Sequence, residues 1–279
     1  MFYKNTLRLF WWNERKIQGK SQENYGDLLG KYLVEKISGK KVIYAFPTKF
    51  SFLDYFMPIY VTSGSILTHV NHKCVVWGSG IIAKEYQLKK AKFLAVRGPE
   101  SRKYLMEQGF EIPEVYGDPG LLLSKYYTPK IAKKYRFGVV PHYNDYKKIK
   151  DWFVNREDVL LISLMTNNIE ETTNQILQCE RIISSSLHGV IIAHAYGIPA
   201  IWQQFTNKVF GDAIKYRDYF ESVEIDPYVF PIKETPYLAN EMEELFENAE
   251  RILPKFGMVE KLQRELLNVC PFKSEIHHE

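Results

Sequence analysis

The segment at residues 181–202 constrains the fold of this chain more than any other. It opens with a β-branched run at 181–183, which is typical of a buried strand. After a polar loop, residues 189–196 are apolar on nearly all sides, which predicts a buried helix. Gly197 can adopt the left-handed conformation that ends such a helix, and Pro199 prevents its continuation before a second strand. We therefore expect a parallel α/β sheet with the polar loop at its carboxyl edge.

The polar loop of this unit contains Ser185, Ser186 and His188 and is a candidate anion site. The first N–H groups of a helix have no internal partner, and the helix dipole favours negative charge there. The hydroxyl and imidazole groups add donors at the same point. The alternative is structural: the serines cap the helix and His188 is a satisfied core histidine. The residue types alone leave both interpretations open.

Two other strands end in residues suited to an anionic ligand. Arg97 follows a strand at 93–96, and its planar guanidinium matches a phosphate or a carboxylate. His142 follows the strand at 137–140 in the equivalent place. Because ligands bind beyond the carboxyl ends of parallel strands, we expect both side chains to face the ligand crevice. The alternative for Arg97 is a surface arginine paired with an acid such as Glu100.

Two loops supply further candidates. Gly78 and Gly80 follow the strand at 74–77 and would let a ligand approach the backbone closely. Asn24 and Asp27 precede an amphipathic helix and could line the crevice. Roles as a turn residue and an N-cap are equally open for these two polar residues.

The segment after residue 202 brings one more cation and one more aromatic ring. Lys215 could bind an anion, and Tyr219 could stack on a sugar ring. Either side chain could also simply belong to a helix surface.

Composition places the chain among soluble globular proteins, with 46% apolar and 25% charged residues. The net charge of +4 permits an anionic ligand without predicting nucleic acid. Three widely spaced cysteines without a CxxC pair argue against a disulfide framework or a zinc site and fit a reducing compartment. With no secretory signal and no apolar run near the roughly 20 residues that span a bilayer, we expect a cytoplasmic protein.

A change in composition indicates a domain boundary. Residues 124–136 contain four lysines and one arginine around Pro129, a composition typical of a solvated linker. We therefore predict an N-terminal domain at 1–135 and a C-terminal domain at 136–261, with 262–279 packing back on the first domain.

Several motifs combine into a family pattern because they follow one another in a fixed order. They are Asn24-Tyr25-Gly26-Asp27, Gly78-Ser79-Gly80, Val96-Arg97-Gly98-Pro99 with Ser101, Gly117-Asp118-Pro119, Ser186-Leu187-His188-Gly189, KYRDYF at 215–220, and Cys270-Pro271-Phe272. Together they resemble the polysaccharide pyruvyl transferase family over nearly the full length.

This resemblance implies an enzyme that transfers pyruvate from phosphoenolpyruvate to two hydroxyls of a sugar as a ketal, in surface polysaccharide biosynthesis. It implies two Rossmann-like domains that face each other across a cleft, in a GT-B-like arrangement with a C-terminal helix crossing back. The expected partners are phosphoenolpyruvate, a lipid-linked sugar acceptor and the inner face of a membrane, with no nucleic acid. We expect no cofactor and no metal.

The reaction that the resemblance implies gives roles to the candidate residues. His188 and Arg97 are the expected catalytic residues, and whether His188 protonates carbon or holds phosphate stays open. The expected donor-binding residues are Arg97, Ser186, Leu187, Gly189 and Lys215. The expected acceptor-binding or cleft-lining residues are Asn24, Asp27, Gly78, Gly80, His142 and Tyr219.

Two other function classes remain. A glycosyltransferase of the same architecture would use a nucleotide-sugar donor, and it would need an acid such as Glu221 or Glu224 to bind ribose. A non-catalytic saccharide-binding protein would account for the 15% of aromatic residues, but not for Arg97, His188 and Lys215 together.

Overall fold

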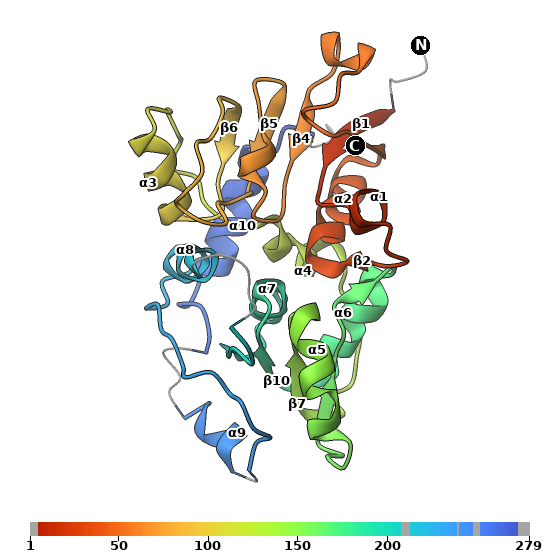
Figure 1. The fold of residues 1–279 in the computed structure, drawn as a ribbon, viewed down its shortest axis with the longest axis vertical. Helices are drawn as coiled ribbons and strands as arrows, with labels where there is room; N and C mark the ends of the chain where they lie inside the picture. Colours follow the sequence, from red (N-terminus) through yellow and green to blue (C-terminus); the bar gives the residue numbers. More distant parts are fainter. Residues whose placement is uncertain (1–4, 208–212, 239, 248–251, 273–279) are drawn as a thin grey trace, which may run out of the picture.

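Two parallel sheets form the framework of the computed structural model, which describes residues 5–207, 213–238, 240–247 and 252–272 (Figure 1). The strands of the first sheet are β1 (Thr6–Phe10), β3 (Lys41–Tyr44), β4 (Ile59–Val61), β5 (Cys74–Trp77) and β6 (Lys92–Ala95). Those of the second are β7 (Tyr135–Val140), β8 (Val159–Leu161), β10 (Cys179–Ser184) and β11 (Ala200–Trp202). A short antiparallel pair, β2 (Glu23–Asn24) and β9 (Met165–Thr166), joins the two halves of the chain.

Helices connect the strands and cover both sheets. The α-helices are α1 (Glu14–Gln18), α2 (Tyr25–Ser38), α3 (Pro99–Glu107), α4 (Leu123–Tyr126), α5 (Tyr143–Ile149), α6 (Ile169–Leu177), α7 (Leu187–Ala195), α8 (Ile214–Ser222), α9 (Glu241–Glu244) and α10 (Met258–Asn268). The 3-10 helices are η1 (Phe52–Tyr55), η2 (Leu67–His69), η3 (Pro119–Leu122) and η4 (Lys150–Phe153). Within the described ranges, no helix is long and apolar enough to cross a membrane.

Both sheets are doubly wound. The first has the strand order β3-β1-β4-β5-β6 and the second β11-β10-β7-β8. In each sheet the earliest strand, β1 or β7, has later strands on both sides, so the direction of winding reverses there. The reversals fall between β1 and β4 and between β7 and β10. Ligands of such sheets bind beyond the carboxyl ends of the strands at this reversal.

The unit at 181–202 forms as expected, with one difference at the start of its helix. Helix α7 begins at Leu187, two residues earlier than the expected start, and Ser186 is the N-cap. His188 therefore lies in the first helical turn rather than in the loop. Gly197 has a φ of 68°, which confirms the predicted left-handed end of the helix.

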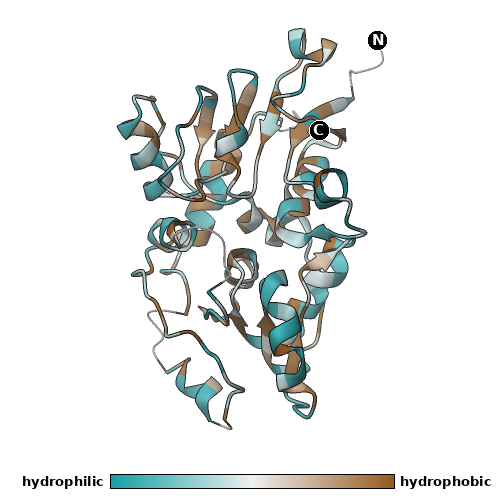
Figure 2. Ribbon diagram, in the orientation of Figure 1, coloured by the Kyte–Doolittle hydropathy of each residue, from teal (hydrophilic) through white to brown (hydrophobic). Residues whose placement is uncertain are grey.

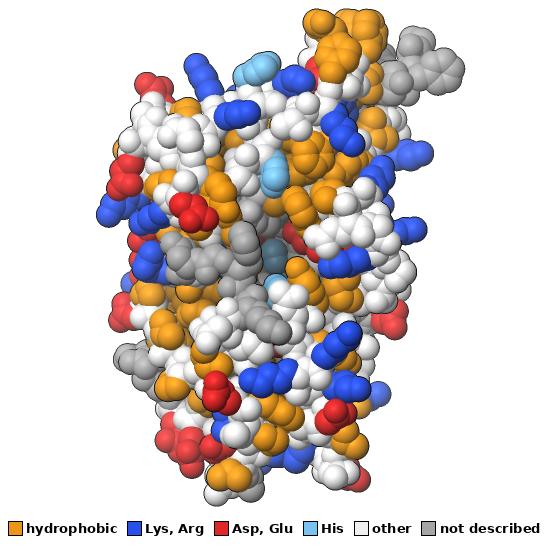
Figure 3. Space-filling model, viewed as in Figure 1, with side chains coloured by type: hydrophobic (Ala, Val, Ile, Leu, Met, Phe, Trp, Pro, Cys, Tyr) orange, Lys and Arg blue, Asp and Glu red, His pale blue; other side chains and the backbone are white. Residues whose placement is uncertain are grey.

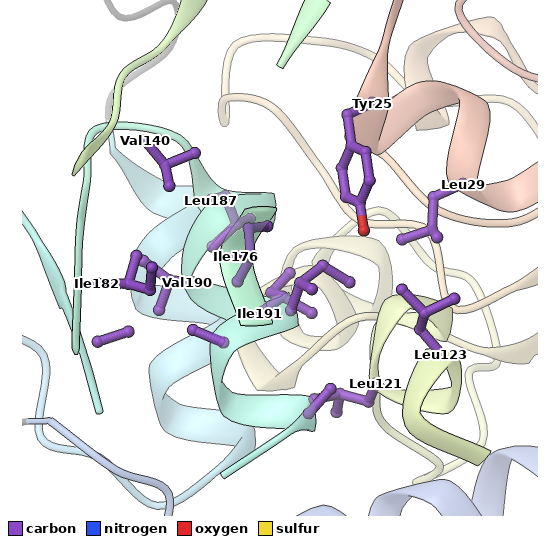
Figure 4. Packing of buried hydrophobic residues seen from close by; sticks show 14 of the residues in the cluster. Tyr25, Leu29, Leu121, Leu123, Val140, Ile176, Ile182, Leu187, Val190 and Ile191 are labelled. Carbon is purple, nitrogen blue, oxygen red and sulfur yellow. The ribbon is translucent and has the colours of Figure 1, made fainter. Parts of the chain in front are cut away.

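The strands and the buried helix α7 are the most apolar parts of the chain, and outer helices such as α3 and α5 carry polar residues (Figure 2). One buried cluster continues from the first half of the chain into the second (Figure 4). Leu29 of α2 and Leu121 of η3 belong to it together with Ile191 of α7. At their junction, a Cβ added to Gly120 would lie 3.1 Å from both Leu29 and Ile191. The two halves are therefore joined by close apolar packing.

The last helix lies against the first half of the molecule. The indole Nε1 of Trp77 donates a 2.9 Å hydrogen bond to the carbonyl of Leu266 in α10. The ring of Phe272 packs edge-on against Trp77 and Tyr60, with centroids 5.1 and 5.4 Å apart. Residues 273–279 of the segment predicted to pack back lie outside the described ranges. The domain limits themselves stay a prediction.

Candidate functional site

A pocket of about 700 Å³ lies beyond the carboxyl ends of the strands at both points of reversal. Trp12 and Ser65 line it from the first sheet, where they follow β1 and β4. His142 and His188 line it from the second sheet, where they follow β7 and β10. In Figure 3, histidine side chains lie in the hollow on the visible face of the molecule. The positions that topology marks as ligand sites in two separate sheets thus share one pocket.

His188 lies at the start of α7, where the backbone can also bind an anion. In the described part of the chain, the N–H groups of Leu187, His188 and Gly189 have no hydrogen-bond acceptor. A nine-residue helix directs its positive end to this point. Gly26 lets α2 approach the imidazole, because a Cβ there would lie 2.0 Å from its Nδ1. The histidine is therefore fixed by the backbone of the Asn24–Asp27 motif.

A buried carboxylate lies behind this histidine. The Oδ2 of Asp118 is 3.6 Å from the Nε2 of His188, and neither atom has a hydrogen-bond partner among the described residues. Ser63 and the N–H of Gly120 donate to the other oxygen, Oδ1, at 3.2 and 2.8 Å. Burial alone would raise the pKa of Asp118, but His188 and Gly120 outweigh it and hold the pKa below its usual value. The carboxylate therefore stays charged and can orient the imidazole.

The pocket also contains a carboxyl and an ammonium group whose pKa values approach neutrality. Burial raises the pKa of Asp27 to about 7, with Glu14 and Glu23 adding to the shift and His188 and Lys215 opposing it. Burial also lowers the pKa of Lys215 to about 8. Both side chains line the pocket, and the Nζ of Lys215 lies 5.3 Å from the centroid of the Tyr216 ring. An acid with this pKa can both give and take a proton near pH 7.

Arg97 does not line the pocket. Its guanidinium is fully buried and binds three protein groups: the carboxylate of Asp218 in α8 at 2.9 Å, the carbonyl of Ile81 at 2.8 Å and the hydroxyl of Ser65 at 2.6 Å. Asp218 also accepts from the N–H and hydroxyl of Ser101. Only Ser65 among these partners reaches the pocket. This geometry corresponds to a residue that positions the pocket wall, rather than to the expected direct contact with a ligand.

A comparison with known protein families shows which family the chain belongs to. The model of the polysaccharide pyruvyl transferase family matches residues 24–202, which include Asp27, Arg97, Asp118 and His188. The chain belongs to the polysaccharide pyruvyl transferase family. It is also 31% identical to an uncharacterized protein of Acanthamoeba polyphaga mimivirus over 214 residues, which are 74% of this chain and 73% of that relative.

Several residues predicted from the sequence of this pyruvyl transferase family member do line the pocket. They are Asn24, Asp27, His142, Ser186, Leu187, His188 and Lys215. Asn24, not Asp27, is the N-cap of α2, because its side chain accepts from the N–H of Gly26 at 3.0 Å. His142 caps α5, and burial lowers its pKa to about 4, so it is neutral at physiological pH.

The glycines of the pyruvyl transferase motifs have protein neighbours where we expected a ligand. A Cβ on Gly78 would lie 2.4 Å from Pro119, and one on Gly80 would lie 2.4 Å from the guanidinium of Arg97. A Cβ on Gly189 would lie 2.3 Å from the hydroxyl of Ser184. All three glycines are buried and lie outside the pocket lining. Their small size allows close packing of motif against motif.

Tyr219, expected to line the cleft as a sugar platform, lies in the core. It is 0% exposed, and its hydroxyl is 3.0 Å from Nδ1 of His194. The two rings stack, with centroids 5.8 Å apart. Helix α8 therefore presents Lys215 to the pocket and Tyr219 to the core.

Sequence reasoning missed the aromatic wall of the pocket. Trp12 lines it together with His69, whose ring centroid is 5.5 Å away. Glu14 and Tyr86 also line the pocket and were not predicted. The position of Trp12 directly after β1, a strand at a point of reversal, is the signal that could have identified it.

Metal ligands do not gather in the described ranges. No group of three or more His, Cys, Asp or Glu side chains there could hold a metal ion. Independence from metals stays a prediction.

Proposed function

We propose that this chain transfers pyruvate from phosphoenolpyruvate to two hydroxyls of a sugar, forming a pyruvate ketal for surface polysaccharide biosynthesis. The observation that carries this proposal is the pocket in which Asp27, His188 and Lys215 meet the N-terminus of α7. Membership of the family supports the reaction class. We further propose that domains at 1–135 and 136–261 face each other across this pocket in a GT-B-like arrangement.

The donor has two anionic groups, so its site must supply positive charge and N–H donors. The ammonium of Lys215 and the free N–H groups of the first turn of α7 offer both. Ser186 and Leu187 line the same end of the pocket. Arg97 contributes indirectly, because it holds Ser65 against this site.

The reaction adds two protons to the donor and removes two from the acceptor. The methylene carbon and the departing phosphate each gain one proton, while two sugar hydroxyls each lose one as their oxygens bond to the central carbon. His188, oriented by Asp118, is our candidate for the donor of the methylene proton. Asp27 can take a proton from a hydroxyl and return it to the phosphate, because its pKa is about 7.

The acceptor has room beside the donor. Trp12 and His69 form an apolar aromatic wall on which a sugar ring could stack, while Asn24 and His142 offer hydrogen-bonding groups. We propose that a lipid-linked sugar binds here. Neither of the two acids that the sequence offered to a nucleotide-sugar enzyme lines this pocket: Glu224 pairs with Lys255 instead, and Glu221 lies elsewhere.

Ligand-induced stabilisation tests the donor. Phosphoenolpyruvate at 100 times its dissociation constant should raise the free energy of unfolding by about 2.7 kcal/mol. We expect this stabilisation to be lost in Lys215→Ala, and retained when the exposed lysine Lys41 is changed to alanine. Stabilisation by nucleotide sugars but not by phosphoenolpyruvate would refute the proposal.

A glycine pair tests the position of His188. Gly26→Ala pushes the imidazole out of place, so we expect phosphate release from phosphoenolpyruvate in the presence of acceptor to fall by about 100-fold or more. Gly30→Ala is the matched control on the same helix, because its Cβ would meet Thr62 and not His188. Equal rates in the two variants would contradict a role of His188 in the reaction.

A further inference from the structure

Four large aromatic side chains are exposed together on one projecting segment. Phe50, Phe52, Tyr55 and Phe56 are 75, 69, 72 and 70% exposed. They occupy η1 and the residues beside it, in the segment that leads into β4 and projects at the top of Figure 1. Figure 3 shows the same region as a raised apolar surface. We call these four residues the aromatic tip.

The conformation of the aromatic tip is fixed by ion pairs and hydrogen bonds beneath the rings. Asp54 lies between the exposed rings but points inward, where Arg8 and Lys73 bind it at 2.5 and 2.7 Å. Arg8 also donates to the carbonyl of Met57. Ser51 and Asp54 form a capping box at the start of η1. The rings are therefore held outward by buried polar contacts.

The rings also pack on one another. Phe52 lies 6.1 Å from Tyr55 and 5.3 Å from Phe56, and Phe50 lies 6.2 Å from Tyr55, measured between ring centroids. An exposed aromatic group of this size marks an interaction site rather than the scattered apolar residues of an ordinary surface.

The segment of chain that carries the tip is basic. Residues 40–58 contain Lys40, Lys41 and Lys49 against the single acid Asp54, which is neutralised by its two basic partners. Lys49 directly precedes the first ring and is exposed. Lysines beside exposed aromatic rings match the chemistry of an anionic lipid surface, where rings enter the interface and ammonium groups meet headgroups.

The size of the tip argues against a second protein as its occupant. Four rings of about 150–250 Å² each, mostly exposed, offer on the order of 500 Å². A stable protein–protein interface needs roughly 800 Å² from each partner. A bilayer needs no complementary surface, because its interface adapts to an inserted group.

We propose that the aromatic tip inserts into the interface of an anionic membrane and anchors the protein at its surface. The segment with the tip begins at the pocket wall: Phe46 contacts His69 of the pocket, with ring centroids 6.0 Å apart, and Lys49 lies over the ring of Phe46. The anchor thus sets the position of the pocket relative to the membrane. It does not depend on the reaction assigned to that pocket.

Vesicle sedimentation with the full chain tests the anchor. The protein should sediment with phosphatidylcholine vesicles that contain phosphatidylglycerol, and less with phosphatidylcholine alone. The variant Phe52→Ser/Phe56→Ser should lower the partition coefficient roughly tenfold or more, because two rings no longer leave water. Added salt should weaken binding by screening the lysines.

Phe256→Ser is the matched control, because this ring is also exposed but lies outside the tip. It should bind vesicles as the wild-type chain does. A chain that stays in the supernatant with both kinds of vesicle would overturn the proposal. So would a tip variant that binds normally, or a dimer in sedimentation velocity that the tip variant abolishes. None of these measurements requires phosphoenolpyruvate or an acceptor, so they stand apart from the test of the transferase.

Discussion

At the scale of single residues, burial of Asp27 brings its pKa close to neutral and lowers the stability of the folded chain at that pH. The unfolded chain ionises an aspartate near pH 3.9, whereas burial raises the pKa of Asp27 to about 7 in the folded chain. The folded state therefore holds this proton over a range where the unfolded state has released it. Its contribution to stability is fully present below about pH 4 and is lost as the pH rises to about 7.

Replacing Asp27 by asparagine should remove the loss of stability between about pH 4 and pH 7. Above pH 7 we expect Asp27→Asn to be more stable than the wild-type chain by on the order of 2–4 kcal/mol, because no buried charge must form. Below pH 4 the two should be alike, and transferase activity should fall at every pH. Urea unfolding at pH 4, 6 and 8 measures the difference. The exposed Asp226→Asn is the control, and parallel stability curves for Asp27→Asn and wild type would contradict the expectation.

At the scale of elements, Arg97 and Asp218 join the loop before α3 to α8. Gly98 lets the two elements touch, because a Cβ there would lie 1.8 Å from the carbonyl of Asp218. The same helix presents Lys215 to the pocket. A fully buried ion pair thus sets the position of the donor-binding cation.

Replacing one partner of this ion pair should lower the free energy of unfolding more than replacing both partners. Asp218→Asn leaves the guanidinium of Arg97 buried without a counter-charge, so we expect a loss of about 3–5 kcal/mol in the free energy of unfolding. The double variant Arg97→Met/Asp218→Leu should recover part of this stability. Its affinity for phosphoenolpyruvate should stay low if Arg97 positions the pocket. Urea unfolding and ligand titration of all variants check this, and additive losses would refute a coupled pair.

Local signals explain which parts of the site could be predicted from sequence. Helix α7, which begins at Leu187 and ends at Ala195, is encoded by its own residues, so its position was predicted to within two residues. Asn24 and His142 are the N-caps of α2 and α5, and Asp27 lies in the first turn of α2, so local helix-start signals place all three at the pocket. The partners of Arg97 could not be predicted, since Asp218 lies 121 residues away. Burial of Tyr219 depends equally on distant contacts, and no local pattern reports them.

At the scale of the whole molecule, the continuous core and α10 should make unfolding cooperative. Leu266 is fully buried against the first half, so Leu266→Ala should cost about 2–5 kcal/mol and lower the stability of both sheets together. The neighbouring Leu267→Ala, which is only half-buried, should cost less. Thermal unfolding followed by both tryptophan fluorescence and circular dichroism should give coincident transitions for each variant. Two separate transitions would show that the halves unfold independently.

The contact between Trp77 and α10 has a consequence for biosynthesis. Leu266, which accepts the hydrogen bond of this indole, is translated 189 residues after it. While the ribosome is still making the second sheet, the strands around Trp77 and Tyr60 lack their apolar cover. A nascent chain in this state exposes surface of the kind that chaperones bind. The first sheet, although complete in sequence early, reaches its final packing only after α10 leaves the ribosome.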